Sequence, residues 1–476
     1  MNKKIIGRIS EKASLNDVYS SNESQFLAIT GRRRIGKTYL INSFFDKNIT
    51  FHFSGILNAS FGQQLQNFQY SLTSYFKSEK PANIPTNWLS AFQNLSICLQ
   101  KNKKKGKQII FIDELPWLDT HKSNFIAALD WFWNSWAVNR NILLIVCGSS
   151  TSWIINKVLN NKGGLHNRIT KRIHLEPFTL HETELFLKYK KVQLSKYQIT
   201  QLYMSLGGVP HYLKEVKPGE SALQAIDRIC FQKDGLLVNE FDNLYKALFK
   251  NSELHLKVIF ALSSKSRGLT RNEILSLTNL NDGGSFTNVL NELEWCNFIR
   301  LQPAYGRTKK DTLYRLSDEY SLFYIRFINK QKTINWTLLG QSQKWKSWSG
   351  YAFENICLKH MSQLKKALGI SNVFSEITSY TQKAKTDVSD GTQIDLLIDR
   401  NDGIINVCEA KFYDKPFVIS KEYATKLNKK INVFQENSKS NKTIFPTIIT
   451  TFGLQANEHS IGFIQQEITL EDLFQP

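Results

Sequence analysis

The stretch that decides the fold is Gly31-Arg32-Arg33-Arg34-Ile35-Gly36-Lys37-Thr38, which has the spacing GxxxxGK[ST]. Phe26–Thr30 before it is an apolar run typical of a buried strand, and Thr38–Phe45 after it is typical of the start of a helix. Glycines let successive backbone N–H groups surround a phosphate, and the helix N-terminus adds a partial positive charge. We expect Lys37 to reach the β- and γ-phosphates and the Thr38 hydroxyl to bind Mg²⁺. The whole stretch is therefore predicted to contact ATP.

A second motif lies further along the chain, where the apolar run Gln108–Ile112 leads into Asp113 and Glu114. Asp113 at the end of a strand is placed to hold Mg²⁺. Glu114 beside it is placed to polarise the attacking water as a general base. A third apolar strand, Ile142–Cys147, is followed by Ser149, which would either sense the γ-phosphate or cap the next helix. Together these motifs predict a site for ATP hydrolysis.

The first 180 residues alternate short apolar strands with longer helical stretches, which predicts a parallel sheet covered on both faces. The aromatic stretch Phe125–Ala137 would either form a stacking surface or pack as a helix against this sheet. Residues 181–250 read as a helical lid, interrupted at Gly207-Gly208-Val209-Pro210. The sequence therefore predicts an α/β core followed by a helical segment.

Residues 251–330 have the pattern of a winged helix. Leu254–Leu262 predicts a first helix, the capping box from Thr270 to Glu273 opens a second, and Phe286–Cys296 predicts a third. Residues 298–305 and 312–316 would form the wing hairpin, whose tip carries the basic residues Arg307, Lys309 and Lys310. Such a module is expected either to contact DNA through its wing or only to couple the ATPase to the last domain.

The charge of the chain points to anionic partners. The 476 residues carry 61 Lys and Arg against 41 Asp and Glu, a formal net charge of +20. Residues 330–476 hold only 18 of these basic residues against 15 acidic ones, so most of the surplus lies in the first two thirds. A surplus of this size favours nucleic acid ahead of a membrane surface, and simple solubility is the alternative explanation.

The cysteines and the hydropathy indicate a reduced, soluble protein. The six cysteines form no CxxC pair, and the nine histidines show no metal-ligand spacing, which is typical of core thiols in a cytoplasm. No apolar run approaches the roughly 18 residues of a membrane span, and the N-terminus lacks a signal-peptide core. We expect a cytoplasmic protein with no membrane partner. Its oligomeric state stays open, a homo-oligomer included.

A second group of candidate residues lies after the Trp-containing linker predicted for residues 331–349. Gln393–Asp399 and Ile404–Lys411 read as strands joined by an Asp-Gly hairpin turn. Asp395 on the first strand and Glu409 on the second are expected to converge at one edge of a sheet. Two carboxylates on adjacent strands suit a Mg²⁺ ion, which prefers oxygen ligands.

Two further side chains would complete this group. Lys411 follows Glu409 by two residues, so it faces the same side of the strand and would orient or deprotonate a metal-bound water. Glu354 lies on the predicted helix 351–366 and would complete the acidic cluster. These four residues predict a catalytic metal site, with an exposed salt-bridged edge as the alternative.

The first 250 residues resemble the archaeal-type ATPases of the STAND branch of AAA-related P-loop proteins. The matching pieces are Ile6-Gly7-Arg8 with Glu11, the Arg-rich P-loop, Asp113-Glu114-Leu115-Pro116, Cys147-Gly148-Ser149-Ser150 and Gly207-Gly208-Val209-Pro210. The resemblance implies that Pro210 packs near the base and follows the nucleotide state. It also matches Arg168 to an arginine before the family's Leu-x-Pro-Phe segment, and leaves open whether Arg168 is an arginine finger or a surface arginine.

Residues 350 to about 450 resemble the PD-(D/E)xK nuclease superfamily, with Gln393-Ile394-Asp395 and Glu409-Ala410-Lys411 as the two motifs. Archaeal-type ATPases carry a C-terminal domain of this pattern and of uncharacterised function. The resemblance implies a P-loop parallel sheet in residues 1–180, then the lid, the winged helix and the linker, and an α/β restriction-endonuclease-like domain in 350–476.

Three hypotheses for the function follow. The first is an ATPase whose Mg²⁺-dependent hydrolysis controls a DNA-associated, metal-dependent nuclease domain. The second is a STAND-type regulatory switch that binds ATP and cuts nothing. The third is a DNA-binding regulator.

Overall fold

The computed structural model describes residues 4–77, 84–102, 106–160, 163–165, 167–329, 336–382 and 392–476. The chain divides into two compact units, Met1–Glu176 and Pro177–Pro476. The predicted lid, winged helix, linker and nuclease-like segments fall in the second unit, and residues 331–335 of that linker lie outside the described part. Among the described helices, none is long and apolar enough to cross a membrane.

The first unit is built on a sheet with the strand order β2-β3-β4-β1-β5, in which neighbouring strands are parallel. Its strands are β1 (Gln25–Thr30), β2 (Ile49–Ser54), β3 (Gln108–Asp113), β4 (Ile142–Cys147) and β5 (Lys171–His174). The parallel sheet confirms the predicted α/β class. Because β4 lies between β1 and β3, the segments that follow these three strands emerge at one edge of the sheet.

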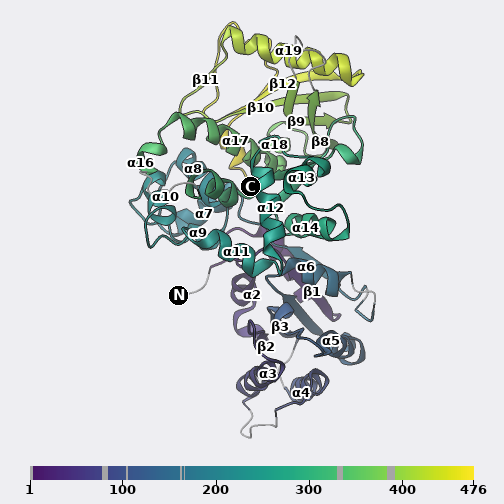
Figure 1. Ribbon diagram of the computed structural model, residues 1–476. Coiled ribbons are helices and arrows are strands. Elements are labelled where there is room, and N and C mark those ends of the chain that lie inside the picture. Colours follow the sequence, from purple (N-terminus) through teal and green to yellow (C-terminus); the bar gives the residue numbers. More distant parts are fainter. Residues whose placement is uncertain are drawn as a thin grey trace. The chain divides into compact units, whose positions relative to one another are not determined.

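Both faces of this sheet are buried because side chains alternate along each strand. On β3, Ile110 and Ile112 belong to one core and Ile109 and Phe111 to the other. The first core is covered by helices that lie together in Figure 1: α3 (Phe61–Phe76), α4 (Trp88–Lys101) and α5 (Phe125–Trp131). The second is covered by α1 (Ile9–Ser20) and α2 (Lys37–Phe45). Two apolar faces explain why the strands read as continuous apolar runs.

The aromatic stretch after Asn124 packs into the first core and does not form an exposed stacking surface. Phe132 is fully buried, and its ring lies 5.1 Å from that of Phe92 on α4. The Trp133 ring lies 4.9 Å from that of Phe26 on β1. Of the two alternatives for this stretch, the structure therefore favours helix packing against the sheet.

The second unit begins with helices around a common apolar core. They are α7 (Leu180–Tyr189), α8 (Lys196–Leu206), α9 (Pro210–Leu213), α10 (Ala222–Cys230) and α11 (Glu240–Leu248). Next come α12 (Ser252–Ser263), α13 (Arg271–Thr278) and α14 (Gly284–Trp295), followed by the antiparallel hairpin of β6 (Ile299–Gln302) and β7 (Leu313–Leu316). The predicted capping box at Thr270 and Glu273 is confirmed at the start of α13.

Helix replaces most of the predicted linker. After α15 (Glu319–Phe323), the chain forms α16 (Trp336–Leu339) and α17 (Gln343–Lys359). The three tryptophans of this region, Trp336, Trp345 and Trp348, are at most 7% exposed and contact one another and Phe327. Burial of such large rings contributes several kcal/mol, roughly 2 to 3 per ring, so this segment is part of the core.

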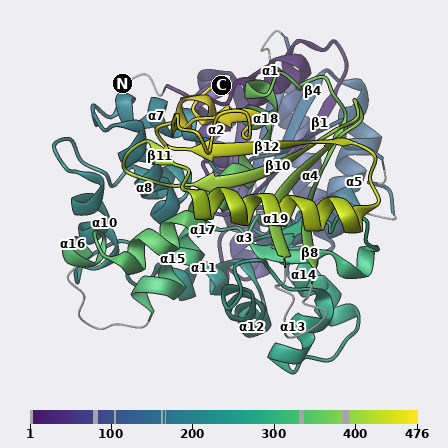
Figure 2. The same cartoon turned by 90° about the horizontal axis from the view of Figure 1, so that it is seen from above.

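The last part of the second unit is a mixed sheet with the order β14-β12-β10-β9-β8. Its strands are β8 (Ser375–Gln382), β9 (Thr392–Arg400), β10 (Ile404–Lys411), β12 (Thr443–Thr450) and β14 (Gln466–Ile468). Helix α19 (Lys421–Ser438) covers one face, as Figures 1 and 2 show. The opposite face packs against α17, α18 (Met361–Ala367) and α20 (Leu470–Leu473). The short pair β11 (Phe417–Val418) and β13 (Leu454–Gln455) is parallel.

His360, at the end of α17, ties two helices of the second unit together. Its Nε2 accepts the Leu180 N–H at 3.0 Å, and its Nδ1 donates to Ile356 O at 2.8 Å, so the ring is held in its neutral form. Burial lowers the pKa of His360 to about 4. The unfolded chain therefore binds a proton between pH 6.5 and 4 that the folded chain does not. The contribution of neutral His360 to the free energy of unfolding is fully present above pH 6.5. It falls by about 3 kcal/mol as the pH drops to 4.

We expect the urea midpoint of unfolding to be lower at pH 5 than at pH 7.5, and His360→Gln to reduce this difference. Glutamine can still accept the Leu180 N–H but carries no charge at either pH. The control is His459→Gln at a partly exposed histidine, which should leave the difference unchanged. An undiminished pH dependence in His360→Gln would assign the acid sensitivity to other groups.

Candidate functional site

The loop from Gly31 to Gly36 connects β1 to the N-terminus of α2. Gly31 has φ +130°, and a Cβ there would lie 2.3 Å from Leu175 O, so only glycine fits. Gly36 caps α2 with φ +93°, another conformation that favours glycine. The motif glycines therefore shape a tight turn that leads the backbone into a helix N-terminus, the arrangement that binds phosphate.

Lys37 is 7% exposed and folds back over this loop. Its Nζ donates to Gly31 O at 2.7 Å and to Arg32 O at 3.0 Å. Arg32 is itself buried, whereas Arg33 and Arg34 are half-buried and Ile35 packs into the core beside α2. The ammonium group is thus held at the mouth of the loop, where nucleotide phosphates would lie.

Thr38 and Asp113 meet across the sheet edge. The Thr38 hydroxyl donates to Asp113 Oδ2 at 2.6 Å, although the two residues lie 75 positions apart. The other carboxylate oxygen accepts the Glu114 N–H at 2.8 Å and the Cys147 thiol at 2.6 Å. Burial, then Asp113, raises the pKa of the Cys147 thiol well above its ordinary value, so it stays a neutral donor. A hydroxyl and a carboxylate oxygen together are a donor set that fits Mg²⁺.

Glu114 and Ser149 form the adjoining contact. The Glu114 backbone is left-handed, with φ +48°. Its Oε2 accepts both the Ser149 N–H and the Ser149 hydroxyl, each at 2.8 Å. The position of β4 between β1 and β3 brings this serine to the carboxylate. The geometry places Ser149 beside the predicted general base, whereas the N-cap residue of α6 (Thr151–Ile154) is Ser150, whose side chain makes no cap hydrogen bond.

Two other residues predicted for this site are Arg168 and Pro210. Arg168 is exposed and belongs to the first unit. Pro210 begins α9 in the second unit. There Gly208 packs so closely that a Cβ would lie 1.9 Å from Phe178 O, and the Phe178 N–H donates to Gly208 O at 2.6 Å. Glycine is thus required before Pro210 by the packing of the second unit itself.

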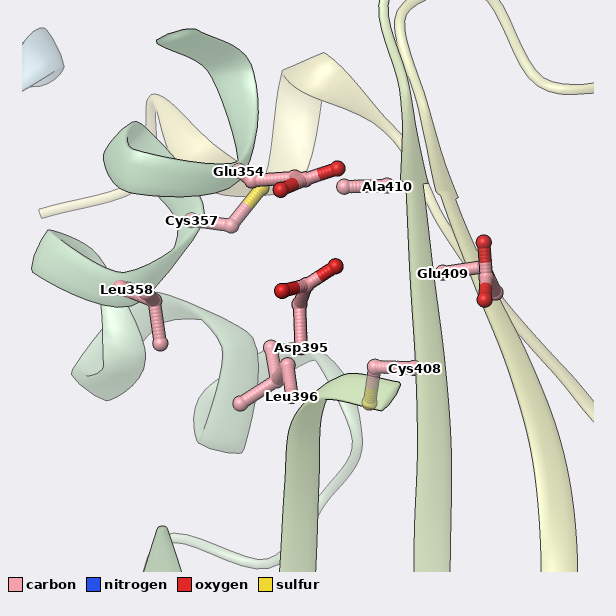
Figure 3. A pocket seen from close by; sticks show the side chains of 8 residues that line it. All are labelled: Glu354, Cys357, Leu358, Asp395, Leu396, Cys408, Glu409 and Ala410. Carbon is pink, nitrogen blue, oxygen red and sulfur yellow. The ribbon is translucent and has the colours of Figure 1, made fainter. Parts of the chain in front are cut away.

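In the C-terminal sheet, Glu354 on α17 and Asp395 on β9 point toward each other across a cavity of about 10 Å³ (Figure 3). This volume suits one water molecule. Cys408 and Ala410 lie on the same side of β10 as these carboxylates. Burial, then the neighbouring Asp395, raises the pKa of Glu354 to about 8, against the opposing effect of Arg315. The two carboxylates thus form an acidic pair, Glu354–Asp395, at a small cavity where each side chain stays partly exposed.

Glu409 also lines this cavity, but its side chain does not face the pair. Its side chain extends from the opposite side of β10 (Figure 3). It forms ion pairs with Lys411 at 3.2 Å and with Lys430 at 2.8 Å, and it accepts the Tyr423 hydroxyl at 3.3 Å. Burial raises the pKa of Glu409, but Lys411 and Lys430 together bring it below its ordinary value. Lys411 thus lies beside Glu409 as the strand period predicts.

Asp395 and Glu409 therefore line one cavity, but their side chains lie on opposite sides of β10. Within the described residues, no group of three or more His, Cys, Asp and Glu side chains is placed to hold a metal ion. The two carboxylates named for Mg²⁺ lie on opposite sides of β10, and Lys411 and Lys430 already neutralise one of them. The residues as arranged do not fit a metal shared by Asp395 and Glu409.

Sequence reasoning missed Arg315, the cation nearest the acidic pair. It lies on β7, is 1% exposed, and has Nη atoms 3.8 Å from Glu354 and 3.7 Å from Asp395. Tyr314 and Leu316 beside it are ordinary strand residues. The one sequence signal for a buried, functional Arg315 was therefore an arginine between two apolar neighbours. The contact spans 39 and 80 positions of sequence, which no local pattern reveals.

Comparisons with known proteins agree with the geometry of the first unit. Residues 6–216 match the family described as an ATPase domain predominantly from Archaea. An uncharacterised protein of Methanocaldococcus jannaschii, MJECL04, is 25% identical over 417 residues, which cover 86% of this chain and 88% of that protein.

Two solved structures align with the chain. The Walker-type ATPase PABY2304 of Pyrococcus abyssi aligns with a TM-score of 0.50 at 17% identity, covering 68% of this chain and 96% of its own. The ORC2 protein of Aeropyrum pernix aligns with a TM-score of 0.44 at 13% identity, covering 68% and 93%. The alignment to the Pyrococcus protein shows that this chain has the fold of a P-loop ATPase.

Proposed function

We propose that the chain binds ATP between the P-loop and Asp113 and hydrolyses it with Glu114 as the general base. The observation that carries this proposal is the set of contacts that brings Thr38 to Asp113 and Ser149 to Glu114 at one edge of the parallel sheet. The direct test is phosphate release from ATP by the purified chain. Release that is absent, or unchanged in Lys37→Ala, would overturn the proposal.

The residues of this site take separate roles. The backbone of Gly31–Gly36 and the start of α2 would surround the phosphates. Lys37 would then donate hydrogen bonds to phosphate oxygens instead of to the carbonyls of Gly31 and Arg32. Thr38 and Asp113 would hold Mg²⁺, which when bound offsets the charge of the phosphates. Glu114 would take a proton from the attacking water, with Ser149 fixing its carboxylate. Pro210 would follow the nucleotide state, as the resemblance to archaeal-type ATPases suggests.

A second activity that we propose belongs to the C-terminal sheet, where the acidic pair Glu354–Asp395 would be the centre of a nuclease-like site acting on DNA. Its support is the pair Glu354–Asp395 at a small cavity that Glu409 also lines, the Lys411–Glu409 contact on the neighbouring strand, and the net charge of +20. The exposed basic residues at the tip of the β6–β7 hairpin, in a winged-helix-like segment, also suit a phosphate backbone: Arg307, Lys309 and Lys310. ATP hydrolysis would then control this domain.

We expect Asp395→Asn to lower DNA cleavage in the presence of Mn²⁺ by at least about 100-fold, because an amide cannot act as an anionic metal ligand. The assay is nicking of a supercoiled plasmid by the purified chain. The matched control is Asp399→Asn on the same strand, whose carboxylate pairs with Lys442 at 2.6 Å and should leave cleavage unchanged.

If the wild type never cleaves DNA with Mg²⁺ or Mn²⁺, the nuclease proposal fails. The remaining alternatives are then the non-cleaving regulatory switch and the DNA-binding regulator. They differ in one property, because only the second requires duplex binding whose affinity falls with salt.

A further inference from the structure

The β6–β7 hairpin packs against the C-terminal sheet. The Tyr305 N–H donates to Ser379 O at 2.8 Å, and the Ser379 N–H donates to Pro303 O at 3.0 Å. Ala304 and Ser379 form an isolated parallel bridge, so the chain just past β6 pairs with β8. The Tyr305 ring also lies 5.1 Å from the Phe434 ring of α19. These contacts hold the base of the hairpin on the C-terminal sheet.

The docked hairpin brings a polar network to the acidic pair. Arg315 Nη1 donates to Gln302 Oε1 at 3.0 Å, and Gln302 Nε2 donates to Asp395 O at 2.6 Å. The same guanidinium lies within ion-pair distance of both Glu354 and Asp395. Both β6 and β7 therefore contribute a side chain that touches the pair or its backbone.

The positive charge of Arg315 is placed to offset the negative charge of the acidic pair, and it disfavours a divalent cation at the same position. Two carboxylates that face each other in a small space repel one another unless a cation lies near them. A buried guanidinium equally needs anionic partners, because removing its charge from water is costly. Arg315 lies within ion-pair distance of both carboxylates, and its charge opposes the rise in the pKa of Glu354. A divalent cation between the same carboxylates would bring two more positive charges within a few ångströms of the guanidinium.

We propose that the hairpin masks the acidic pair, with the Arg315 guanidinium in the place of a divalent cation, so that hairpin docking and metal binding exclude each other. The inference rests on the proposed nuclease-like role of the pair. On this proposal the structure corresponds to the masked state, which explains why the pair is not arranged to hold a metal ion. Displacement of the hairpin would then be the step that prepares the site.

The test is Mn²⁺ binding to the full chain without nucleotide, measured by electron paramagnetic resonance. Arg315→Gln keeps a polar side chain that can bond Gln302 but removes the charge, and we expect it to tighten Mn²⁺ binding by about 10-fold or more. The gain must disappear in the double variant Glu354→Gln, Arg315→Gln. The matched control is Arg228→Gln, which removes another arginine paired with a carboxylate, Glu220, and should change nothing.

The outcomes separate this inference from the proposed function. Mn²⁺ binding that depends on Glu354 but is equal in wild type and Arg315→Gln would overturn the masking and leave the metal site standing. Binding that no substitution of Glu354 alters would overturn both. The ATPase proposal is untouched in either case, because its test is phosphate release.

Hydrogen exchange of the wild type provides a second test, which can be used if Arg315→Gln does not fold. Millimolar Mn²⁺ is expected to speed hydrogen exchange at the amides of Tyr305 and Ser379 at least about 3-fold, because the metal and the docked hairpin compete. The same addition to Glu354→Gln should leave these amides unchanged. Equal exchange with and without Mn²⁺ in the wild type would overturn the inference.

Discussion

Lys37→Ala is expected to abolish ATP binding, weakening it by at least about 100-fold. Lys37 is the P-loop lysine, and its buried ammonium group already reaches Gly31 O and Arg32 O at the mouth of the loop. A charge-assisted hydrogen bond to a phosphate in such a place contributes about 1.5 to 3 kcal/mol, and this lysine would make more than one. Calorimetric titration of the purified variant with ATP and Mg²⁺ measures the loss.

The control must separate lost phosphate contacts from a lost fold, because Lys37 also holds two loop carbonyls. Lys47→Ala removes an exposed lysine just beyond α2 and should leave ATP affinity unchanged. The urea midpoint of Lys37→Ala, measured in parallel, shows whether loss of the buried contacts to Gly31 O and Arg32 O lowers the stability of the fold. Wild-type ATP affinity in Lys37→Ala would remove the basis of the proposed site.

Strands that are buried on both faces were predictable from sequence. The apolar runs at 26–30, 108–112 and 142–147 correspond to β1, β3 and β4 to within one residue at either end. The edge strands β2 and β5 were not predicted. β2 mixes Thr50 and His52 with aromatic residues. β5 is only four residues long, with Lys171 half-buried and Arg172 exposed. Edge strands carry fewer apolar positions, so their signal is weak.

The linker was missed for a different reason. Residues 331–349 combine lysines, glutamines and serines with tryptophans, a composition that resembles a surface segment. The tryptophans decide the outcome, because each buries a large ring in the core of the second unit. Composition averages over a segment, whereas the fold depends on the few side chains that are buried.

A bulge in the pairing of β8 with β9 determines which side of the sheet Asp395 faces relative to Glu409. Between Thr378 and Tyr380 of β8, the partner strand advances from Leu397 to Ile394, one residue more than a regular pairing allows. A bulge of this kind turns the side chains next to it toward the other face of the sheet. The period-two rule therefore relates Lys411 to Glu409 on one regular strand, but it does not carry across to Asp395.

Glu114→Gln is expected to preserve ATP binding and to lower the hydrolysis rate by about 100- to 1000-fold. The amide oxygen of glutamine can still accept the Ser149 N–H and hydroxyl, so the local structure should persist. An amide cannot take a proton from the attacking water, and loss of a general base costs about this factor. Single-turnover measurement of phosphate release separates this step from binding and product release.

Two comparisons show whether the lower hydrolysis rate is due to loss of Glu114 as the general base. Glu23→Gln removes an exposed carboxylate before β1 and should hydrolyse ATP like the wild type. ATP affinity measured by titration should be the same in Glu114→Gln and the wild type, whereas a variant defective in binding would indicate that the carboxylate shapes the phosphate site. Hydrolysis at the wild-type rate in Glu114→Gln would mean that another group receives the proton, and the contact between Glu114 and Ser149 would then be structural.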